Sequence, residues 1–283
     1  MAIPRKKKTT TNSKTTKKAT NLERSLRERI LYDAKTLRLP LSEETLDAAL
    51  KHAEQHSLSH LDFLEQILGE PAALCRQRAI ERRIREARFR EEKSLADFDW
   101  KFNSQTIDRK QIEGLATGEF VRRGENLVMV GQSGVGKSFL LQAMSRRFCE
   151  LGYRVRYTTS AGLLEDLRKS LADQTLPRRV RYWSRFDLVV IDEFGFDRIE
   201  RGECPQAASL FYKMIDARSG KRSTALATNV DFDAWGEYLG DPPLAMAFLD
   251  RVVDGAILLK IRGKSYRAHR AQRPSDLSEP AAE

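Results

Sequence analysis

Residues Gly131 to Ser138 have the pattern GxxxxGK[ST], which is the strongest chemical signal in this 283-residue sequence. Glycines in such a loop let successive backbone N–H groups turn toward a chain of phosphates. In this pattern Lys137 reaches the β- and γ-phosphates of a nucleotide, and the Ser138 hydroxyl binds Mg²⁺. The predicted nucleotide-binding residues are therefore Gly131, Gln132, Ser133, Gly134, Val135, Gly136, Lys137, Ser138 and the adjoining Phe139.

Two adjacent carboxylates, Asp192 and Glu193, follow the apolar run Leu188–Ile191. The run predicts a buried strand, and the end of that strand would place both acids beside the phosphate-binding loop. Asp192 suits the shell of Mg²⁺, and Glu193 suits activation of the water that attacks ATP. The alternative is that the pair only ends a strand. The second acid favours an ATPase over a small-molecule P-loop kinase, whose acceptor is a substrate hydroxyl.

A neutral polar pair, Thr228 and Asn229, ends the next predicted strand. A side chain there can reach the γ-phosphate or position the attacking water. We favour Asn229 for this role, with Thr228 as the second candidate. The alternative is that Asn229 is only a turn residue.

Residues 94–270 alternate short apolar runs with helical patterns. This alternation predicts an α/β fold in which a parallel five-stranded sheet is covered by helices on both faces. Phe98, Trp100 and Phe102 alternate just before this domain, which indicates an extended linker. The predicted strands are Asn126–Val130, Arg154–Thr158, Leu188–Ile191, Ser223–Ala227 and Ala256–Lys260, and the predicted helices are Lys137–Glu150, Ala161–Ala172, Pro205–Arg218, Phe232–Leu239 and Leu244–Val253.

Residues 21–93 have apolar residues at helical spacing and predict a small all-helical domain that precedes the sheet. Its last helix, from Ala72 to Phe89, is predicted to start after a break at Gly69 and Pro71. Contact with nucleic acid and an ordinary solvated face are two interpretations of its arginines. The domain could also bind a protein partner rather than DNA, which its arginines equally permit. These arginines, with one just beyond the helix, are Arg76, Arg78, Arg82, Arg83, Arg85, Arg88 and Arg90.

His52, His56 and His60 have the spacing of a metal-binding face on an unbroken helix. Ser57 and Ser59 favour a break in that helix, so solvated histidines are the preferred interpretation. Cys75, Cys149 and Cys204 form no CxxC pair, which favours reduced thiols over a disulfide framework or a thiolate zinc site.

The net charge of +10 is concentrated at the start of the chain. Residues 1–20 contain no acid and predict a disordered basic arm, which either contacts a phosphate backbone or only aids solubility. Residues 271–283 predict a disordered tail. No run approaches the roughly 18 apolar residues of a membrane helix, and no secretory signal is present, so we expect a cytoplasmic protein. The cations of the arm are Arg5, Lys6, Lys7, Lys8, Lys14, Lys17 and Lys18.

Taken together, these motifs resemble AAA+ ATPases of the DnaC/IstB-like group, most closely the IstB-like transposition helper proteins of bacterial insertion sequences. The resemblance covers residues 22–270 and implies a P-loop AAA+ core with ATP and Mg²⁺ as cofactors. It also implies assembly on double-stranded DNA and activation of a partner transposase. The segments that carry it are Thr36–Pro40, Phe98–Trp100, Gly118–Leu140, Val189–Gly195, Leu226–Asn229, Leu249–Arg251 and Gly263–Arg267.

The resemblance also implies roles for two arginines. Arg251 matches the arginine finger, which such ATPases supply to the nucleotide of a neighbouring subunit to offset charge in the transition state. Arg267 matches a γ-phosphate sensor, although a basic surface patch is an equal alternative. Little sequence follows residue 270, so we expect no full helical lid domain.

An arginine finger that acts on the nucleotide of a neighbouring subunit implies a homo-oligomer, either a ring or a helical filament. Two other functions share much of this pattern. A helicase loader of the DnaC type would prefer single-stranded DNA and a helicase partner. A non-hydrolytic, nucleotide-gated DNA scaffold would not need Glu193. The basic N-terminal region argues against the small-molecule kinase.

Overall fold

The computed structural model describes residues 25–196 and 206–272. The predicted arm, Cys204 and nearly all of the predicted tail lie outside these ranges. The chain divides by packing into two compact units, residues 1–79 and 80–283. The division falls within one helix, so it comes earlier in the chain than the domain limit expected at residues 93 and 94. Within the described ranges no helix is long and apolar enough to cross a membrane.

The described part of the first unit is helical and contains α2 (Leu26–Thr36), α3 (Glu43–His56) and the start of α4 (His60–Ala87). Ser25 caps α2, and Ser42 caps α3 by accepting a hydrogen bond from the Thr45 N–H. Ser57 ends α3 in the left-handed region at φ 51°. This is the predicted break, and it separates His60 from the helix that carries His52 and His56. The described residues contain no group of side chains that could hold a metal ion.

Helix α4 continues through Gly69 and Pro71, so the predicted break at these residues is wrong. Proline removes one backbone donor and strains the preceding turn, but tertiary packing can offset this cost. Pro71 is buried, which supplies such packing. The two helices expected here therefore form one, and the arginines from Arg76 to Arg85 lie on its second half.

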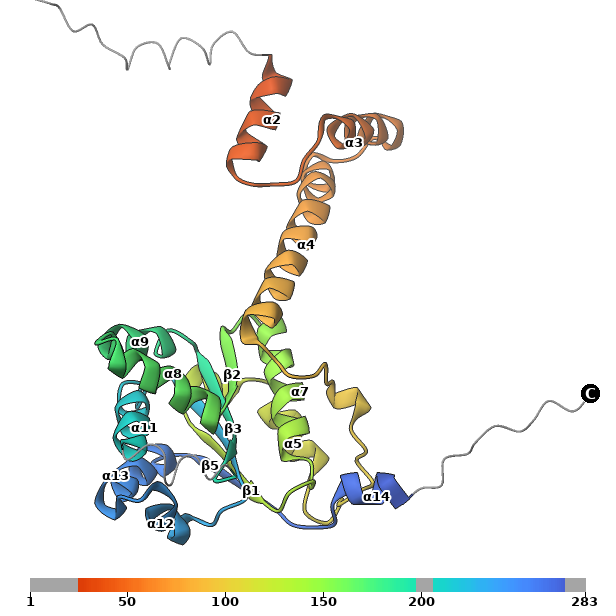
Figure 1. Ribbon diagram of the computed structural model, residues 1–283. Helices are drawn as coiled ribbons and strands as arrows, with labels where there is room; N and C mark the ends of the chain where they lie inside the picture. Colours follow the sequence, from red (N-terminus) through yellow and green to blue (C-terminus); the bar gives the residue numbers. More distant parts are fainter. Residues whose placement is uncertain (1–24, 197–205, 273–283) are drawn as a thin grey trace, which may run out of the picture. The chain divides into compact units, whose positions relative to one another are not determined.

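The second unit contains a five-stranded sheet in which every paired strand is parallel to its neighbour. The order of strands is β2-β3-β4-β1-β5, which confirms the predicted fold class. Figure 1 shows the sheet with helices on both of its sides. The strands are β1 (Leu127–Gly131), β2 (Val155–Thr159), β3 (Leu188–Phe194), β4 (Ser223–Thr228) and β5 (Ile257–Ile261).

Successive residues of a strand point to opposite faces of the sheet, so its apolar strands have apolar side chains on both faces. Helices cover both faces and bury these side chains. Val189 and Ile191 of β3 enter one core, and Leu188 and Val190 enter the other. The first core is covered by α8 (Ser160–Ala172), α9 (Leu176–Trp183), α11 (Ala207–Asp216), α12 (Trp235–Leu239) and α13 (Pro242–Val253), with η2 (Phe232–Ala234) before α12. The second core is covered by α5 (Arg109–Leu115), α6 (Glu119–Arg123) and α7 (Lys137–Glu150).

The expected extended linker is instead a folded segment that starts with η1 (Leu95–Asp97) and continues in turns. The Asp99 carboxylate accepts hydrogen bonds from the N–H groups of Lys101 and Phe102, which favours a turn over a strand. The ring of Phe102 packs 5.0 Å from Tyr266, at the start of α14 (Tyr266–Gln272). This segment therefore contacts the end of the chain that follows β5.

Candidate nucleotide-binding site

The phosphate-binding loop connects β1 to α7 and is enclosed by neighbouring backbone. Gly134 and Gly136 have φ angles of 81° and 111°, which side chains rarely adopt. A Cβ atom at Gly131 would lie 2.2 Å from the carbonyl oxygen of Ile261. One at Gly134 would lie 2.2 Å from Ser265 Oγ. The loop therefore needs glycine both for its conformation and for its close contact with the end of β5.

Two segments that the motif alone did not place here surround this loop. The Tyr266 N–H donates to the Gly134 carbonyl at 2.9 Å. The ring of Phe98 lies 3.1 Å from the position of a Cβ at Gly136, and its centroid lies 5.3 Å from that of Phe139. The only sequence signals for these contacts are the aromatic residues of the linker and the closing Gly263–Arg267 segment.

Lys137 is buried and folds back onto its own loop. Its Nζ donates to the carbonyl oxygens of Gly131 and Gln132 at 2.6 and 2.8 Å. Burial lowers the pKa of Lys137, the Asp192 carboxylate opposes this effect, and the charge of Arg267 adds to it. No described carboxylate forms an ion pair with Lys137. Its ammonium group is thus free to exchange two neutral acceptors for phosphate oxygens.

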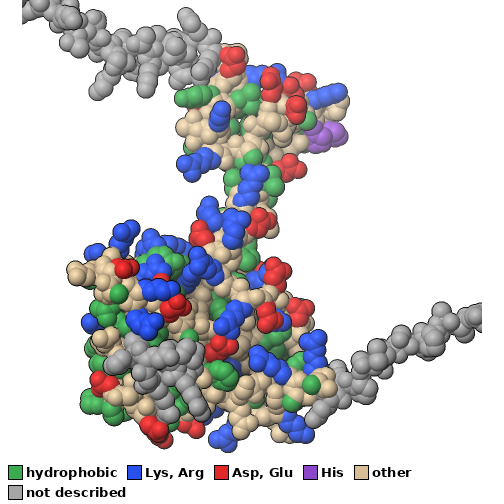
Figure 2. Space-filling view, in the orientation of Figure 1, with side chains coloured by type: hydrophobic (Ala, Val, Ile, Leu, Met, Phe, Trp, Pro, Cys, Tyr) green, Lys and Arg blue, Asp and Glu red, His purple; other side chains and the backbone are tan. Residues whose placement is uncertain are grey.

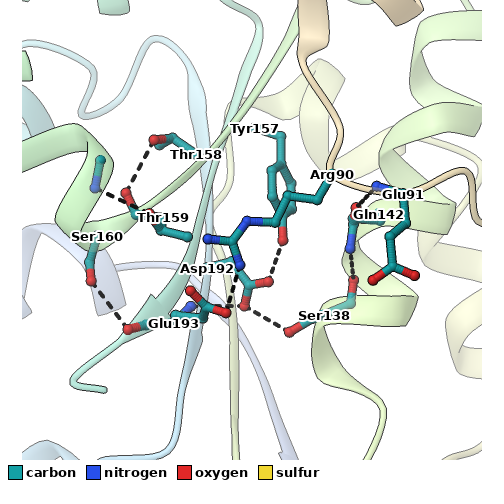
Figure 3. Close-up of polar contacts among 11 residues, drawn as sticks. Arg90, Glu91, Ser138, Gln142, Tyr157, Thr158, Thr159, Ser160, Asp192 and Glu193 are labelled. Atoms are coloured by element: carbon teal, nitrogen blue, oxygen red, sulfur yellow. Dashed lines mark hydrogen bonds and ion pairs between the residues drawn. The ribbon is translucent and has the colours of Figure 1, made fainter. Parts of the chain in front are cut away.

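Asp192 lies at the end of β3, is 2% exposed, and is held by three donors (Figure 3). Ser138 Oγ donates to Oδ1 at 3.0 Å, and the backbone N–H of Glu193 donates to the same oxygen at 2.8 Å. The Tyr157 hydroxyl donates to Oδ2. Burial raises the pKa of Tyr157, and the Asp192 carboxylate raises it further, so this hydroxyl stays a donor. The hydroxyl of Ser138 and the carboxylate of Asp192 are hard oxygen ligands that fit Mg²⁺.

Glu193 follows at a register shift between β3 and β4 and has φ 59°. Its side chain turns out of the strand and is 42% exposed. Oε1 accepts a hydrogen bond from Arg90 Nη1 at 2.7 Å (Figure 3). Burial alone would lower the pKa of Arg90, but the hydrogen bond to Glu193 and its charge outweigh burial and raise it. The expected catalytic carboxylate is therefore paired with an arginine that the motifs did not predict.

Thr228 and Asn229 lie at the end of β4, next to these acids. The Thr228 hydroxyl accepts a hydrogen bond from the Val230 N–H at 3.0 Å and therefore stabilises a turn. The Asn229 side chain is exposed, and its Oδ1 lies 3.5 Å from the position of a Cβ at Gly195. Of the two, Asn229 has the side chain that is free to face a ligand.

A cavity of about 750 Å³ brings most of the predicted site residues together. Gly131 and Gln132 belong to the loop but do not line the cavity. Phe98 and Arg90 also line it, as does Arg270. The predicted residues along its wall are Ser133, Gly134, Val135, Gly136, Lys137, Ser138, Phe139, Asp192, Glu193, Thr228, Asn229 and Arg267.

Arg251 does not line this cavity. It lies on α13, where its Nε is 3.2 Å from Asp216 Oδ1 and its Nη1 is 3.8 Å from Asp250 Oδ2. The hydrogen bond to Asp216 raises the pKa of Arg251. Its guanidinium group is 42% exposed, so it is accessible to another molecule.

A glycine loop between β1 and α7, with adjacent acids at the end of β3, defines the class of P-loop nucleotide-binding proteins. Comparison with known proteins narrows this class. The chain belongs to the family of IstB-like ATP binding proteins, whose family model matches residues 32–274. The resemblance noted from the sequence is thereby confirmed.

Individual relatives agree with this family. A protein of Pseudomonas aeruginosa, named as an ATP-binding protein of insertion sequence IS21, is 34% identical over 222 residues, 78% of this chain and 82% of the relative. Its counterpart of insertion sequence IS232 from Bacillus thuringiensis subsp. berliner is 30% identical over 82% of this chain and 90% of the relative. The crystal structure of DnaI aligns with a TM-score of 0.49 and 22% identity, over 60% of this chain and 91% of that chain.

Proposed function

We propose that this chain is an Mg²⁺-dependent ATPase that assembles with ATP on double-stranded DNA and supports target selection and transposase activation in insertion-sequence transposition. The main support is the cavity that joins Lys137, Ser138, Asp192 and Glu193 in a member of this family. The names of the relatives place them in insertion sequences, which supports a transposase as the partner.

Each residue at the cavity has a defined task in this proposal. Lys137 exchanges its two carbonyl contacts for phosphate oxygens, and Ser138 and Asp192 hold Mg²⁺. Bound ATP with Mg²⁺ supplies a polarised γ-phosphoryl group. Glu193 leaves Arg90 and accepts a proton from the attacking water, which Asn229 helps to position. Arg267, which lines the cavity, contacts the γ-phosphate in this proposal.

We assign Arg251 to the site of a neighbouring subunit, because it does not line its own cavity. Two inactive variants can test this assignment. Arg251→Ala should bind ATP but hydrolyse it poorly, and Lys137→Ala should not bind it. A mixture of the two should regain ATP turnover, since a Lys137→Ala subunit still supplies Arg251. Turnover in Arg251→Ala alone at the normal rate would contradict the assignment.

DNA binding in this proposal rests on phosphate contacts from the basic helix α4 and the N-terminal residues. Such binding should be weakly sequence-specific and steeply dependent on salt. Arg78, Arg82 and Arg85 of α4 have exposed side chains, which is what phosphate contact requires.

The decisive experiment measures the assembled mass on a duplex and on a single strand of equal nucleotide content. The nucleotide conditions are ATP, ADP, and ATP with Glu193→Gln. ATP-dependent growth on the duplex would support the proposal. Binding confined to single strands would favour a helicase loader, and growth without any nucleotide dependence would contradict the coupling of ATP to DNA.

A further inference from the structure

A second cavity, of about 330 Å³, lies at the β2 edge of the sheet. Figure 2 shows Lys and Arg side chains gathered over α9 and this edge. All of its lining residues belong to the unit of residues 80–283. Four of them are arginines, Arg88, Arg90, Arg156 and Arg179, and Asp166 is the one carboxylate among them.

Arg156 is the most deeply placed of these arginines and is 9% exposed. Its Nη1 donates to the Glu86 carbonyl at 2.9 Å, but its Nε is buried with no hydrogen-bond partner among the described residues. A buried charged donor without an acceptor costs free energy, so its persistence needs an explanation. Burial lowers the pKa of Arg156, and the positive charges of Arg88 and Arg179 lower it further. Tyr182 and Asp166 act in the opposite direction but do not cancel this decrease.

Asp166, the one carboxylate that lines the cavity, already has partners for its oxygen atoms. Asp166 forms a two-pronged ion pair with Arg179 and also accepts a hydrogen bond from Trp183 Nε1 at 2.8 Å. Arg88 is exposed and has no ion-pair partner among the described residues. The cavity therefore holds two guanidinium groups, those of Arg88 and Arg156, with which no described carboxylate forms an ion pair.

The backbone adds a further attraction for an anion. Helix α8 has 13 residues, and its N-terminal turn lines the cavity at Thr159 and Gly162. The positive end of a helix favours negative charge. The Gly162 N–H in this turn already donates to Thr159 Oγ1 at 3.1 Å, so the attraction comes from the helix dipole. Arginine matches the geometry of phosphate through paired N–H donors.

We propose that this second cavity binds a phosphate group, supplied by the backbone of bound DNA. The inference rests on the proposed function, because DNA is the source of the phosphate. It also gives the guanidinium groups of Arg88 and Arg156, which both line the cavity, a common acceptor.

Arg90 connects this cavity with the nucleotide site, since it lines both. Its Nη1 is held by Glu193, and the first residue of α8, Ser160, donates to the Glu193 carbonyl at 3.2 Å (Figure 3). A phosphate among the arginines competes with Glu193 for Arg90. The released carboxylate of Glu193 can then act on water, so DNA binding accelerates ATP hydrolysis.

Binding is tested with the first cavity filled by a non-hydrolysable ATP analogue, so that added phosphate cannot enter it. Inorganic phosphate and a short duplex are titrated into the wild type, Arg88→Gln and Arg156→Gln over a range of salt concentrations. Arg168→Gln is the matched control, because Arg168 is exposed on α8 but does not line the cavity. For duplex binding, each cavity variant should reduce the slope of log affinity against log salt by about 0.9, and the control should keep the wild-type slope.

Equal slopes in all four proteins, without binding of inorganic phosphate, would overturn the proposal. An equal decrease of the salt slope in Arg168→Gln would also overturn the proposal, because it would show that the slope follows net charge alone. Binding of inorganic phosphate that requires Arg156, combined with unchanged duplex slopes, would support a phosphate site and reject DNA as its source. Arg88→Gln is a surface change, so the test does not depend on whether Arg156→Gln folds.

The link through Arg90 has its own measurement, the ratio of ATP turnover with and without duplex. Arg90→Gln should turn over ATP without DNA at the DNA-stimulated rate of the wild type and should show no further stimulation. Arg168→Gln should keep the wild-type ratio. An unchanged ratio in Arg90→Gln would overturn the link. A wild type that hydrolyses no ATP would instead contradict the proposed function, and the phosphate titration would still test the cavity.

Discussion

Three reactive side chains of the nucleotide site are engaged by neighbouring groups. Lys137 donates to two carbonyl oxygens, Asp192 accepts from Ser138 and Tyr157, and Glu193 pairs with Arg90. Such contacts offset the cost of removing charges from water. A bound nucleotide must therefore replace these contacts with its own.

Substitution of Glu193 by Gln should separate binding from hydrolysis. The amide cannot accept a proton from water, so we expect ATP turnover to fall by about 10²- to 10⁴-fold. The affinity for an ATP analogue should stay within about twofold, because Lys137, Ser138 and Asp192 are unchanged. Turnover and analogue binding are measured together, with Glu165→Gln on the exposed face of α8 as the control. Turnover within tenfold of the wild type would contradict the role of Glu193.

The sequence could predict that Lys137, Asp192 and Glu193 gather at this site, because the glycine loop and the adjacent acids are local patterns with one known geometry. It could not predict Arg90. The pair Arg90 and Glu193 is separated by 103 positions, and one arginine among seven carries no local mark of its partner. Contacts of this kind depend on tertiary packing, which spacing along the chain does not encode.

At the scale of elements, close backbone approach explains the position of the phosphate-binding loop. β1 pairs with β5 up to Gly131 and Ile261. The Ile261 carbonyl leaves no room for a side chain at Gly131. The loop is therefore held by the sheet edge on one side and by α7 on the other.

Two glycine substitutions should have opposite effects. Gly131→Ala forces apart backbone atoms of β1 and β5, so we expect lower thermal stability and loss of ATP binding. Gly114→Ala lies in α5, where a Cβ meets nothing within 4 Å, and should stabilise the protein by up to about 1 kcal/mol. Thermal unfolding and titration with an ATP analogue measure both effects. Normal binding of the ATP analogue by Gly131→Ala would show that the backbone of β5 can move away from Gly131 at little cost.

Four of the five strands agree with the prediction within one residue, because such apolar runs have no other stable place than a buried parallel sheet. The strand end predicted at Ile191 is too early, since β3 continues for three more residues to Phe194. The short helices α5, α6 and α9 were not predicted, since five to eight residues give too little periodicity. The expected break at Pro71 failed because packing outweighed local preference.

At the scale of the whole molecule, the division between the two units falls between residues 79 and 80, so residues 80–93 belong to the same unit as the nucleotide site. Residues 80–93 pack with the sheet: Ala87 is fully buried in its second core, and the Glu91 N–H donates to Gln142 at 3.1 Å. The end of α4 is thus part of the nucleotide-binding unit.

Two fragments should distinguish the packing division from the domain limit predicted from the sequence. Residues 80–283 should bind an ATP analogue like the full chain, because every residue lining the cavity lies within them. Residues 94–283 lack Ala87 and Phe89, so their free energy of unfolding should be lower by about 2 kcal/mol or more. Chemical denaturation and analogue titration of both fragments provide the comparison. Equal stability would show that residues 80–93 add nothing to this unit.

The folded aromatic segment before α5 has an optical consequence. Trp100 lies 4.9 Å from Phe98, which in turn contacts Gly136 of the phosphate-binding loop. The other two tryptophans, Trp183 and Trp235, are 3% and 1% exposed in the core on the opposite face of the sheet. Their emission should form a constant background, while that of Trp100 responds when the loop receives a ligand. We therefore expect Trp100 to serve as an intrinsic fluorescent reporter, with which nucleotide binding should be measurable without a label.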